Sequence, residues 1–413
     1  MSSSASSAAK TIIDLVDTYH QAQIHFLGEL VKVPSDNPPG DCNPHAARAA
    51  ELLERLGFSV ERHGVPKDAV LANGMISATN LIIRKRFGEG GKVIALNAHG
   101  DVVPPGEGWS VDPYGAVIKD GVMYGRGVAV SKSDFATYAF ALKALDESGA
   151  AKNGAVELHF TYDEEAGGAI GPGLIMAEGL SKPDYVISAG FSYSVTIAHN
   201  GCLHLEVRVE GKSAHAARPD TGVDALEAAT KLLTSLYALR ERYKATRSKV
   251  PGIDHPTLTI GLISGGINTN VVPDLVTMRI DRRLIPEENP EKAERELIAE
   301  IERVCAEIPG IHVKTRRILL ARPFTPQPGQ EKLVEALQRN ARLVMGIDIP
   351  AEGVPLYTDA RLYSAAGVPT ALYGAGPRSL LEANGHRADE KLKLEDLRKA
   401  TKVVALTLAE LLG

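Results

Sequence analysis

Two short apolar runs, each ending in charged residues, constrain the fold of this chain most strongly. Lys92 to Ala98 has the apolar, β-branched pattern of a buried strand and leads directly into His99-Gly100-Asp101. Ala155 to Thr161 is a second run of this kind and leads into Asp163-Glu164-Glu165. Because ligands bind at the carboxyl ends of strands in open α/β sheets, we expect these polar segments to meet at one sheet edge.

The surrounding pattern indicates an α/β fold. Strands are expected near residues 57–63, 78–85, 92–98, 154–162 and 184–189, and helices near 11–33, 46–56, 132–148 and 391–412. Alternation of strands with helices predicts a mixed, mainly parallel sheet that is covered on both faces.

The pattern changes near Asn200. Strands at 202–209, 257–262 and 275–283 and helices at 224–243 and 291–305 give the β-α-β-β-α-β order of a ferredoxin-like α+β unit. We therefore expect a catalytic domain in two parts, residues 1–199 and 318–413, with an inserted domain at 200–317.

Composition favours an enzyme with a small-molecule substrate. The 413 residues, 44% of them hydrophobic, can bury a core large enough for two domains. Lysine and arginine number 46 against 51 acidic residues, a balance that favours neither nucleic acid nor a membrane as partner. No apolar run is long enough to cross a bilayer. Met1 to Ala9 lacks the apolar core of a signal peptide and is expected to be an irregular start.

The cysteines indicate a reducing compartment, and we therefore expect a cytoplasmic location. Cys42, Cys202 and Cys305 are widely spaced and odd in number, which does not suit a disulfide framework. None has the Cys or His spacing of a zinc motif, so core packing is the expected role of each. His159 and His204 alternate with apolar neighbours and are interpreted as ordinary sheet residues.

The polar segments have the chemistry of a hydrolytic metal site. A neutral imidazole and a carboxylate suit a zinc-like ion, and Asp101 can orient His99 through the other ring nitrogen. Glu164 and Glu165 can divide the work, one binding metal and the other accepting a proton from water. Taken singly, however, a His-Gly-Asp turn and a Glu pair are also common as a polar turn and a solvated strand end.

Eight segments in a fixed order decide between these interpretations. They are Asn97-Ala-His-Gly-Asp-Val-Val103, Tyr124-Gly-Arg-Gly127, Thr161-Tyr-Asp-Glu-Glu-Ala-Gly-Gly168, Gly211-Lys-Ser-Ala-His215, Gly266-Ile-Asn-Thr-Asn-Val-Val-Pro273, Asp281-Arg-Arg283, Thr358-Asp-Ala-Arg361 and His386-Arg-Ala-Asp-Glu390. With these segments, which are distributed from Asn97 to Glu390 over most of its length, the chain resembles the co-catalytic zinc amidohydrolases and peptidases that include aminoacylase, acetylornithine deacetylase, succinyl-diaminopimelate desuccinylase and carboxypeptidase G.

The resemblance implies a role for each matching residue of the catalytic domain. His99 would bind one metal ion, and Glu165 and His386 would bind the second. Glu164 would be the general base, and Asp101 would position His99.

The resemblance also implies that the inserted domain is a lid and that the protein is a homodimer. His215 would reach across the dimer interface to stabilise the oxyanion, and Asn270 and Arg283 would grip the substrate and its carboxylate. Tyr357, where the family usually has a small residue, would border the substrate pocket beside Thr358.

Two departures from the family pattern concern metal ligands. Val130 stands where a bridging Asp is usual, and Gly190 stands where a Glu is usual. The surviving set of His99, Glu165 and His386 has the three protein ligands that a mononuclear catalytic zinc uses. We therefore expect one ion per chain, zinc, manganese or cobalt, and no complete second site.

Other acidic residues offer alternative ligands for the altered site. Asp134 lies about one helical turn beyond Val130, within reach through a water molecule. Asp163 is another candidate, although an acidic residue in a first helical turn is also favoured by the helix dipole alone.

The sequence thus predicts a metal-dependent hydrolase that cleaves an amide bond in a small N-acyl amino acid, a dipeptide or a related carboxylate-bearing amide. Two alternatives remain open. One is a metal-poor relative that acts as a binding protein, and the other is an enzyme that catalyses a different C–N bond cleavage.

Overall fold

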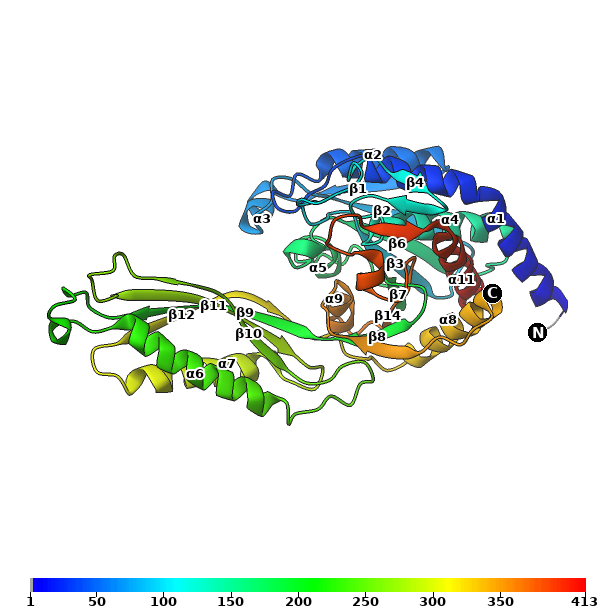
Figure 1. Ribbon diagram of the computed structural model, residues 1–413. Coiled ribbons are helices and arrows are strands. Elements are labelled where there is room, and N and C mark those ends of the chain that lie inside the picture. The colour runs from blue at the N-terminus through cyan, green and yellow to red at the C-terminus, as the bar shows by residue number, and fades with distance from the viewer. Residues whose placement is uncertain (1–2) are drawn as a thin grey trace. The chain divides into compact units, whose positions relative to one another are not determined.

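The computed structural model describes residues 3–413, which form two compact units (Figure 1). Among the described residues, unit 1 comprises 3–197, Pro326–Glu352 and Thr358–Gly413. Unit 2 comprises Ala198–Thr325 and Gly353–Tyr357. The chain therefore leaves unit 1 twice, first to build most of unit 2 and again for the short segment Gly353–Tyr357.

Unit 1 is built on an eight-stranded sheet with the order β1-β2-β6-β3-β7-β14-β8-β13. The strands are β1 (Val60–Gly64), β2 (Thr79–Arg86), β3 (Val93–His99), β6 (Ala155–Thr161), β7 (Tyr185–Ser188), β8 (Val195–His199), β13 (Ala351–Val354) and β14 (Thr370–Leu372). The neighbouring pairs among β6, β3, β7 and β14 are parallel, whereas β2 pairs with β1 and β6 in antiparallel fashion. The predicted mixed, mainly parallel sheet is confirmed.

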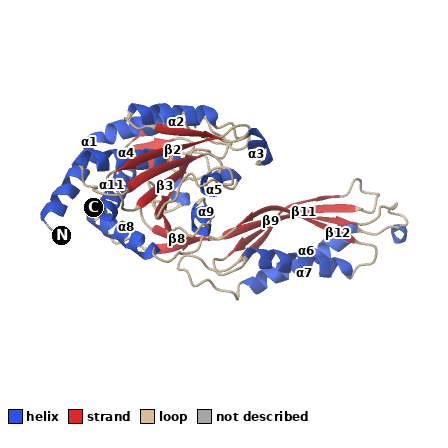
Figure 2. Cartoon of the chain, turned by 180° about the vertical axis from the view of Figure 1, so that it is seen from behind, coloured by secondary structure: helices blue, strands red, loops and turns tan. Residues whose placement is uncertain are grey.

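Helices cover both faces of this sheet, as predicted (Figure 2). On one face lie α1 (Ser3–Val31), α2 (Asn43–Arg55), α4 (Lys132–Ser148) and α11 (Leu394–Leu412), whose apolar residues join Leu96 and Leu158 in the main core. On the other face, Tyr363 of α9 (Ala360–Ala365) packs with Ala95 and Val186. Every residue of β6 is buried, as a strand covered on two faces requires.

The remaining elements of unit 1 are α8 (Gln330–Met345), whose apolar residues also join the main core, and several short helices and strands. The short elements are α3 (Lys67–Ala72), α5 (Pro172–Ala177), α10 (Leu380–Ala383), and a three-stranded sheet of β15 (Lys391–Lys393), β5 (Val122–Tyr124) and β4 (Val117–Lys119).

Two predictions at the chain ends need correction. The irregular start expected for residues 1–9 is wrong from Ser3 onward, because α1 already begins there, and residues 1–2 lie outside the described part of the chain. The final helix begins at Leu394 instead of Lys391, since Lys391–Lys393 pairs with β5. Among the described residues, no helix combines the length and apolar character that a membrane span needs.

Unit 2 has the predicted β-α-β-β-α-β order. Its elements are β9 (Gly201–Glu210), α6 (Ala225–Tyr243), β10 (Thr257–Gly265), β11 (Leu275–Leu284), α7 (Pro290–Ala306) and β12 (His312–Ala321). A 3₁₀ turn at Pro219–Thr221 lies between β9 and α6, and another, Glu164–Ala166, lies in unit 1. The four strands form an antiparallel sheet in the order β10-β11-β9-β12, as in a ferredoxin-like fold.

The two faces of the unit 2 sheet differ. Leu203, Leu205 and Val207 of β9 are fully buried in a core that includes Leu232 of α6 and Leu297 of α7. Because side chains alternate along a strand, the intervening residues of β9 project from the opposite face. That face carries polar and charged side chains and is covered by neither α6 nor α7.

The side chain of Asp224 caps the N-terminus of α6 by accepting hydrogen bonds from the backbone N–H groups of Leu226 (2.8 Å) and Glu227 (3.1 Å). We expect Asp224→Ala to lower the free energy of unfolding by about 1 kcal/mol in urea titrations. Asp224→Asn, which keeps an accepting oxygen, should be nearly neutral. Equal destabilisation by both substitutions would contradict the capping role.

Candidate active site

His99 is the last residue of β3, and its ring is held at the carboxyl edge of the sheet. The Ser131 hydroxyl accepts from the His99 backbone N–H at 3.2 Å and donates to the His99 carbonyl at 3.0 Å. Nδ1 of His99 lies 2.9 Å from the backbone carbonyl oxygen of Asp101. When Nδ1 donates to this carbonyl, Nε2 keeps its lone pair free for a cation.

The side chain of Asp101 is fully buried and holds the acidic segment in place. It accepts hydrogen bonds from the backbone N–H groups of Glu164 (3.2 Å) and Glu165 (3.1 Å) and from the side-chain amide of Asn37 (3.0 Å). Asp101 therefore orients His99 mainly through its backbone, and its carboxylate fixes the two glutamates, a second role that the sequence did not reveal.

The two glutamates lie in the 3₁₀ turn Glu164–Ala166, directly after β6. Oε2 of Glu164 is 4.0 Å from Nε2 of His99, and His99, Glu164 and Glu165 each offer one ligand atom within 4.8 Å of the others. His386 contributes Nε2 at 3.3 Å from Oε1 of Glu165. The structure thus brings together four residues that the sequence selected, although His386 contacts only Glu165 and lies outside the tightest cluster.

The site carries more buried negative charge than its cations balance. Burial, with Glu165 and Asp101 adding to it, raises the pKa of Glu164 to about 7 despite the opposing effect of His99. Burial alone would lower the pKa of His99, but the charges of Glu164 and Asp101 raise it well above its usual value. The surplus of acidic groups therefore favours the binding of a cation or a proton at this site.

Asp359, which precedes α9, was not singled out from the sequence. It is only 3% exposed, and neither of its carboxylate oxygens has a hydrogen-bond partner. Burial first, and then the charges of Glu164 and Asp163, raise its pKa well above the usual range. An unpaired buried carboxylate is unfavourable unless a proton or a cation compensates it. The donor set of His99, Glu165 and His386, next to this acidic surplus, fits a divalent cation.

The first altered ligand position, Val130, leads into α4 and borders the site. Its backbone N–H donates to Oε1 of Glu390 at 3.1 Å. A Cβ placed on Gly385 would lie 3.6 Å from Cγ2 of Val130, so the valine side chain packs close to the segment that carries His386. An apolar group occupies this part of the site.

The second altered position, Gly190, has no room for a carboxylate. Its N–H donates to Oδ2 of Asp134 at 3.2 Å, and a Cβ on Gly190 would approach the backbone nitrogen of Tyr373 to 2.8 Å. Such an approach is too close for any side chain without a backbone shift. The local backbone, as well as the residue type, therefore removes this ligand.

Asp134 and Asp163, the alternative ligands that the sequence suggests, hydrogen-bond to the backbone instead. The two oxygens of Asp134 accept from the backbone N–H groups of Gly190 and Ala375, and burial raises its pKa to about 8. Oδ2 of Asp163 accepts from the N–H of Ile170 at 2.7 Å. Neither residue belongs to the cluster around His99, so both act as backbone supports in this structure.

The residues expected to bind substrate are divided between the units. In unit 1, Thr358 accepts from the N–H of Ala360 at 3.3 Å, and nearby Arg361 donates to the carbonyl of Gly167. In unit 2, the guanidinium of Arg283 grips Asp281 at 2.9 and 3.1 Å and lies 5.9 Å from the ring centre of Tyr357.

His215 and Asn270 are exposed neighbours in unit 2. The N–H of Ala216 donates to the Asn270 carbonyl at 3.0 Å, and the N–H of Ala217 donates to Nδ1 of His215 at 3.1 Å.

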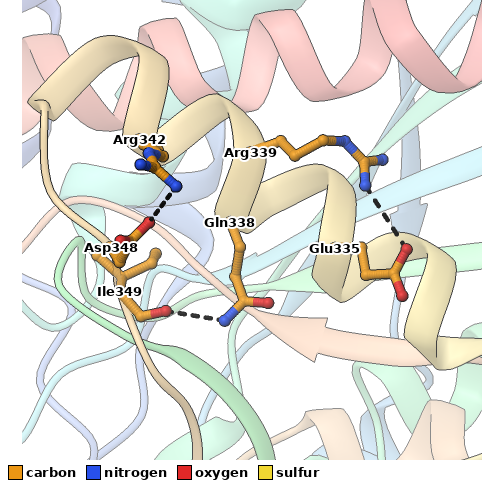
Figure 3. A pocket seen from close by; sticks show the side chains of 6 residues that line it. All are labelled: Glu335, Gln338, Arg339, Arg342, Asp348 and Ile349. Atoms are coloured by element: carbon orange, nitrogen blue, oxygen red, sulfur yellow. Dashed lines mark hydrogen bonds and ion pairs between the residues drawn. The ribbon is translucent and has the colours of Figure 1, made fainter.

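A cavity of about 360 Å³ lies along α8 (Figure 3). Its lining residues are Glu335, Gln338, Arg339, Arg342, Asp348 and Ile349. None of them belongs to the cluster around His99, so this cavity is not the candidate active site.

Replacing Asp101 should disturb both glutamates. We expect Asp101→Asn to lower the free energy of unfolding by about 1–3 kcal/mol, because an amide group would face backbone N–H donors. The same variant should also bind divalent metal more weakly in equilibrium titrations. Asp112→Asn, at an exposed turn, is the matched control. Wild-type metal affinity in Asp101→Asn would contradict the anchoring role.

Comparison with known proteins identifies the family. Residues 95–410 match peptidase family M20/M25/M40. The chain is 32% identical to an acetylornithine deacetylase from Vibrio vulnificus over 372 residues, which span 88% of this chain and 90% of the relative. An acetylornithine deacetylase from Proteus mirabilis is 34% identical over 241 residues, which span 57% of this chain and 59% of that protein.

The fold agrees with these matches. The solved structure of a Bacillus subtilis protein, described as a dinuclear metal-binding peptidase of the M20 family, has a TM-score of 0.69 and 18% sequence identity. The similarity covers 96% of this chain and 99% of that one. The chain therefore belongs to the M20/M25/M40 peptidase family, whose members are divalent-metal hydrolases, and is a metallo-amidohydrolase or metallopeptidase that acts on C–N bonds.

Proposed function

We propose that this enzyme hydrolyses the amide bond of a small N-acyl amino acid, a dipeptide or a related carboxylate-bearing amide. The observation that carries the proposal is the convergence of His99, Glu164 and Glu165 within 4.8 Å in a buried site with surplus negative charge. The relatives named acetylornithine deacetylase support an N-acyl amino acid as the substrate class.

One divalent cation per chain, zinc or alternatively manganese or cobalt, would be held by His99, Glu165 and His386. When bound, the cation supplies Lewis acidity that polarises the substrate carbonyl and the attacking water. Val130 and Gly190 provide no ligands for a second ion.

Glu164 is the proposed general base and acid. Its pKa, raised to about 7 by burial, suits a group that both accepts and returns a proton near neutral pH. Glu164 takes a proton from water as the new C–O bond forms, and it delivers that proton to the nitrogen as the C–N bond breaks. Asp101 is a positioning residue, because it fixes the backbone of both glutamates.

Unit 2 is the proposed lid and dimerisation domain, with Arg283 and Asn270 gripping the substrate and Tyr357 and Thr358 bordering its pocket. Arg283 already pairs with Asp281, so a substrate carboxylate has to share or replace that contact. His215 would stabilise the oxyanion in the site of the other subunit.

A homodimer is favoured by the edge of the unit 2 sheet. Strand β10 is an edge strand, and its residues Leu262 and Ile263 are 60% and 52% exposed. Ile267, just beyond the strand, is 78% exposed. Exposed apolar residues on an unpaired edge are suited to pairing with another chain.

The proposed location is the cytoplasm, and the proposed partner is a small-molecule substrate. Cys42, Cys202 and Cys305 are all buried and form no disulfide, as suits a reducing compartment.

Val130 and Gly190 favour a second candidate, a metal-poor relative that binds its ligand without hydrolysis or cleaves a different C–N bond. Glu164 and Glu165 argue for the hydrolase, because binding alone does not require two adjacent glutamates beside an imidazole.

Glu164→Gln separates these candidates. It should lower kcat for an N-acetylated or dipeptide substrate by about 10²–10⁴-fold, because the proton acceptor is lost, and should leave Kd nearly unchanged. Assays of turnover and calorimetric titrations of binding measure the two quantities. Glu178→Gln removes the same charge at an exposed position, so it is the control and should remain active. Full turnover in Glu164→Gln would show that another group is the base.

Disrupting the β10 edge tests the dimer. Leu262→Asp should shift the sedimentation coefficient from dimer to monomer and lower kcat at least tenfold, since His215 would then be missing from the opposite site. Leu343→Asp, at a 48% exposed leucine on α8, should change neither. A dimer that survives Leu262→Asp would place the interface elsewhere.

A further inference from the structure

A cluster of metal-ligating side chains lies on the face of the unit 2 sheet that α6 and α7 do not cover. Cys202 and His204 are two residues apart on β9, so their side chains project from the same face. On β11, Asp281 pairs directly with His204, and Arg283 pairs directly with Cys202. Neighbouring strands therefore place a thiol, an imidazole and a carboxylate side by side.

The three potential ligand atoms converge on one point. Nε2 of His204 lies 3.1 Å from Sγ of Cys202 and 3.0 Å from Oδ2 of Asp281, and Sγ and Oδ2 are 3.9 Å apart. A tetrahedral ion with bonds of about 2.0–2.3 Å separates its ligand atoms by about 3.3–3.8 Å. The observed spacing is close to this range.

Hydrogen bonds do not fully explain why the side chains of Cys202, His204 and Asp281 lie so close together. Nε2 of His204 faces both the thiol and the carboxylate, and a single ring N–H cannot donate fully to two acceptors. Three lone-pair atoms around one point are instead the arrangement of a ligand set.

We infer that Cys202, His204 and Asp281 form a second metal site, which takes a zinc-like divalent ion and is separate from the cluster around His99. A thiolate and an imidazole select zinc or a similar soft ion over magnesium or calcium. Three protein ligands leave one coordination position for water or a small ligand.

The surroundings of the cluster fit this assignment. Arg283 grips both oxygens of Asp281, as outer partners commonly hold a ligating carboxylate. Cys202 is fully buried, but the side chains of His204 and Asp281 are 35% and 30% exposed, so an ion can enter from the open face.

Two features of the cluster oppose the binding of a metal ion. The positive charge of Arg283 repels a cation, and the hydrogen bond with Asp281, together with Cys202, raises the pKa of His204 to about 9. An incoming ion therefore displaces protons from the cluster, so its affinity will be lower than that of a closed structural zinc site.

The sequence predicts core packing for Cys202 and an ordinary sheet position for His204, and Cys202 is buried on β9, the strand that also carries His204. The proposed metal site adds a role that the sequence does not predict. In an extended strand a spacing of two is enough to place both side chains on one face. The third ligand is 77 residues from His204 in sequence, so only strand pairing reveals it.

Cobalt(II) titration tests the site in the full-length, reduced, chelator-treated protein. A cobalt–thiolate bond gives a charge-transfer band in the near ultraviolet that histidine and carboxylate ligands do not give. The wild type should develop this band with a plateau at one cobalt-bound thiolate per chain. Cys202→Ser should abolish it, and His204→Ala should weaken cobalt affinity at least tenfold.

Two controls separate this site from its alternatives. Cys305→Ser removes a buried cysteine in the α7 core and should keep the band. His99→Ala removes a proposed active-site ligand and should also keep it, so the outcome does not depend on the proposed hydrolase. Absence of the band in the wild type, which needs no variant, would overturn the inference, as would its persistence in Cys202→Ser.

Discussion

The active site depends on the buried carboxylate of Asp101. Its two oxygens accept hydrogen bonds from the side-chain amide of Asn37 and from the backbone N–H groups of Glu164 and Glu165. These bonds connect the segments around Asn37, Asp101 and Glu164, which are distant in sequence. The carbonyl of Asp101 fixes the ring of His99. Because a buried charge is tolerated only when its hydrogen bonds are satisfied, these contacts are mutually dependent. They deliver an imidazole and two carboxylates to one sheet edge.

The same edge carries Val130 and Gly190, the two positions at which the resemblance implies carboxylate ligands. Val130 supplies an apolar side chain, and Gly190 is enclosed by backbone and bound to Asp134. Asp134 thus supports the altered loop and does not replace the missing ligand. Asp359 remains as a buried carboxylate without a hydrogen-bond partner, so the site still favours a cation despite the two losses.

The sequence predicts those features of the fold and the site that depend on local motifs and on the periodicity of apolar residues. The apolar runs ending at His99 and Thr161 specify central strands, and the motifs after them specify the site, because strand ends converge in a parallel sheet. Features that depend on pairing or burial were missed. The carboxylate of Asp359 is unusual only because the fold buries it without a partner. Asp281 approaches Cys202 only through the register of β9 and β11, which no spacing in the sequence encodes.

The central claim is that His99 and its neighbours hold a divalent ion. It is tested by elemental analysis of protein purified without chelator or affinity metal, in a Cys202→Ser background that removes the thiolate from the cluster of Cys202, His204 and Asp281. We expect about one ion per chain in that protein and a loss of that ion when His99→Ala is added. Equal metal content with and without His99, or no ion even after reconstitution with zinc, manganese and cobalt, would contradict it.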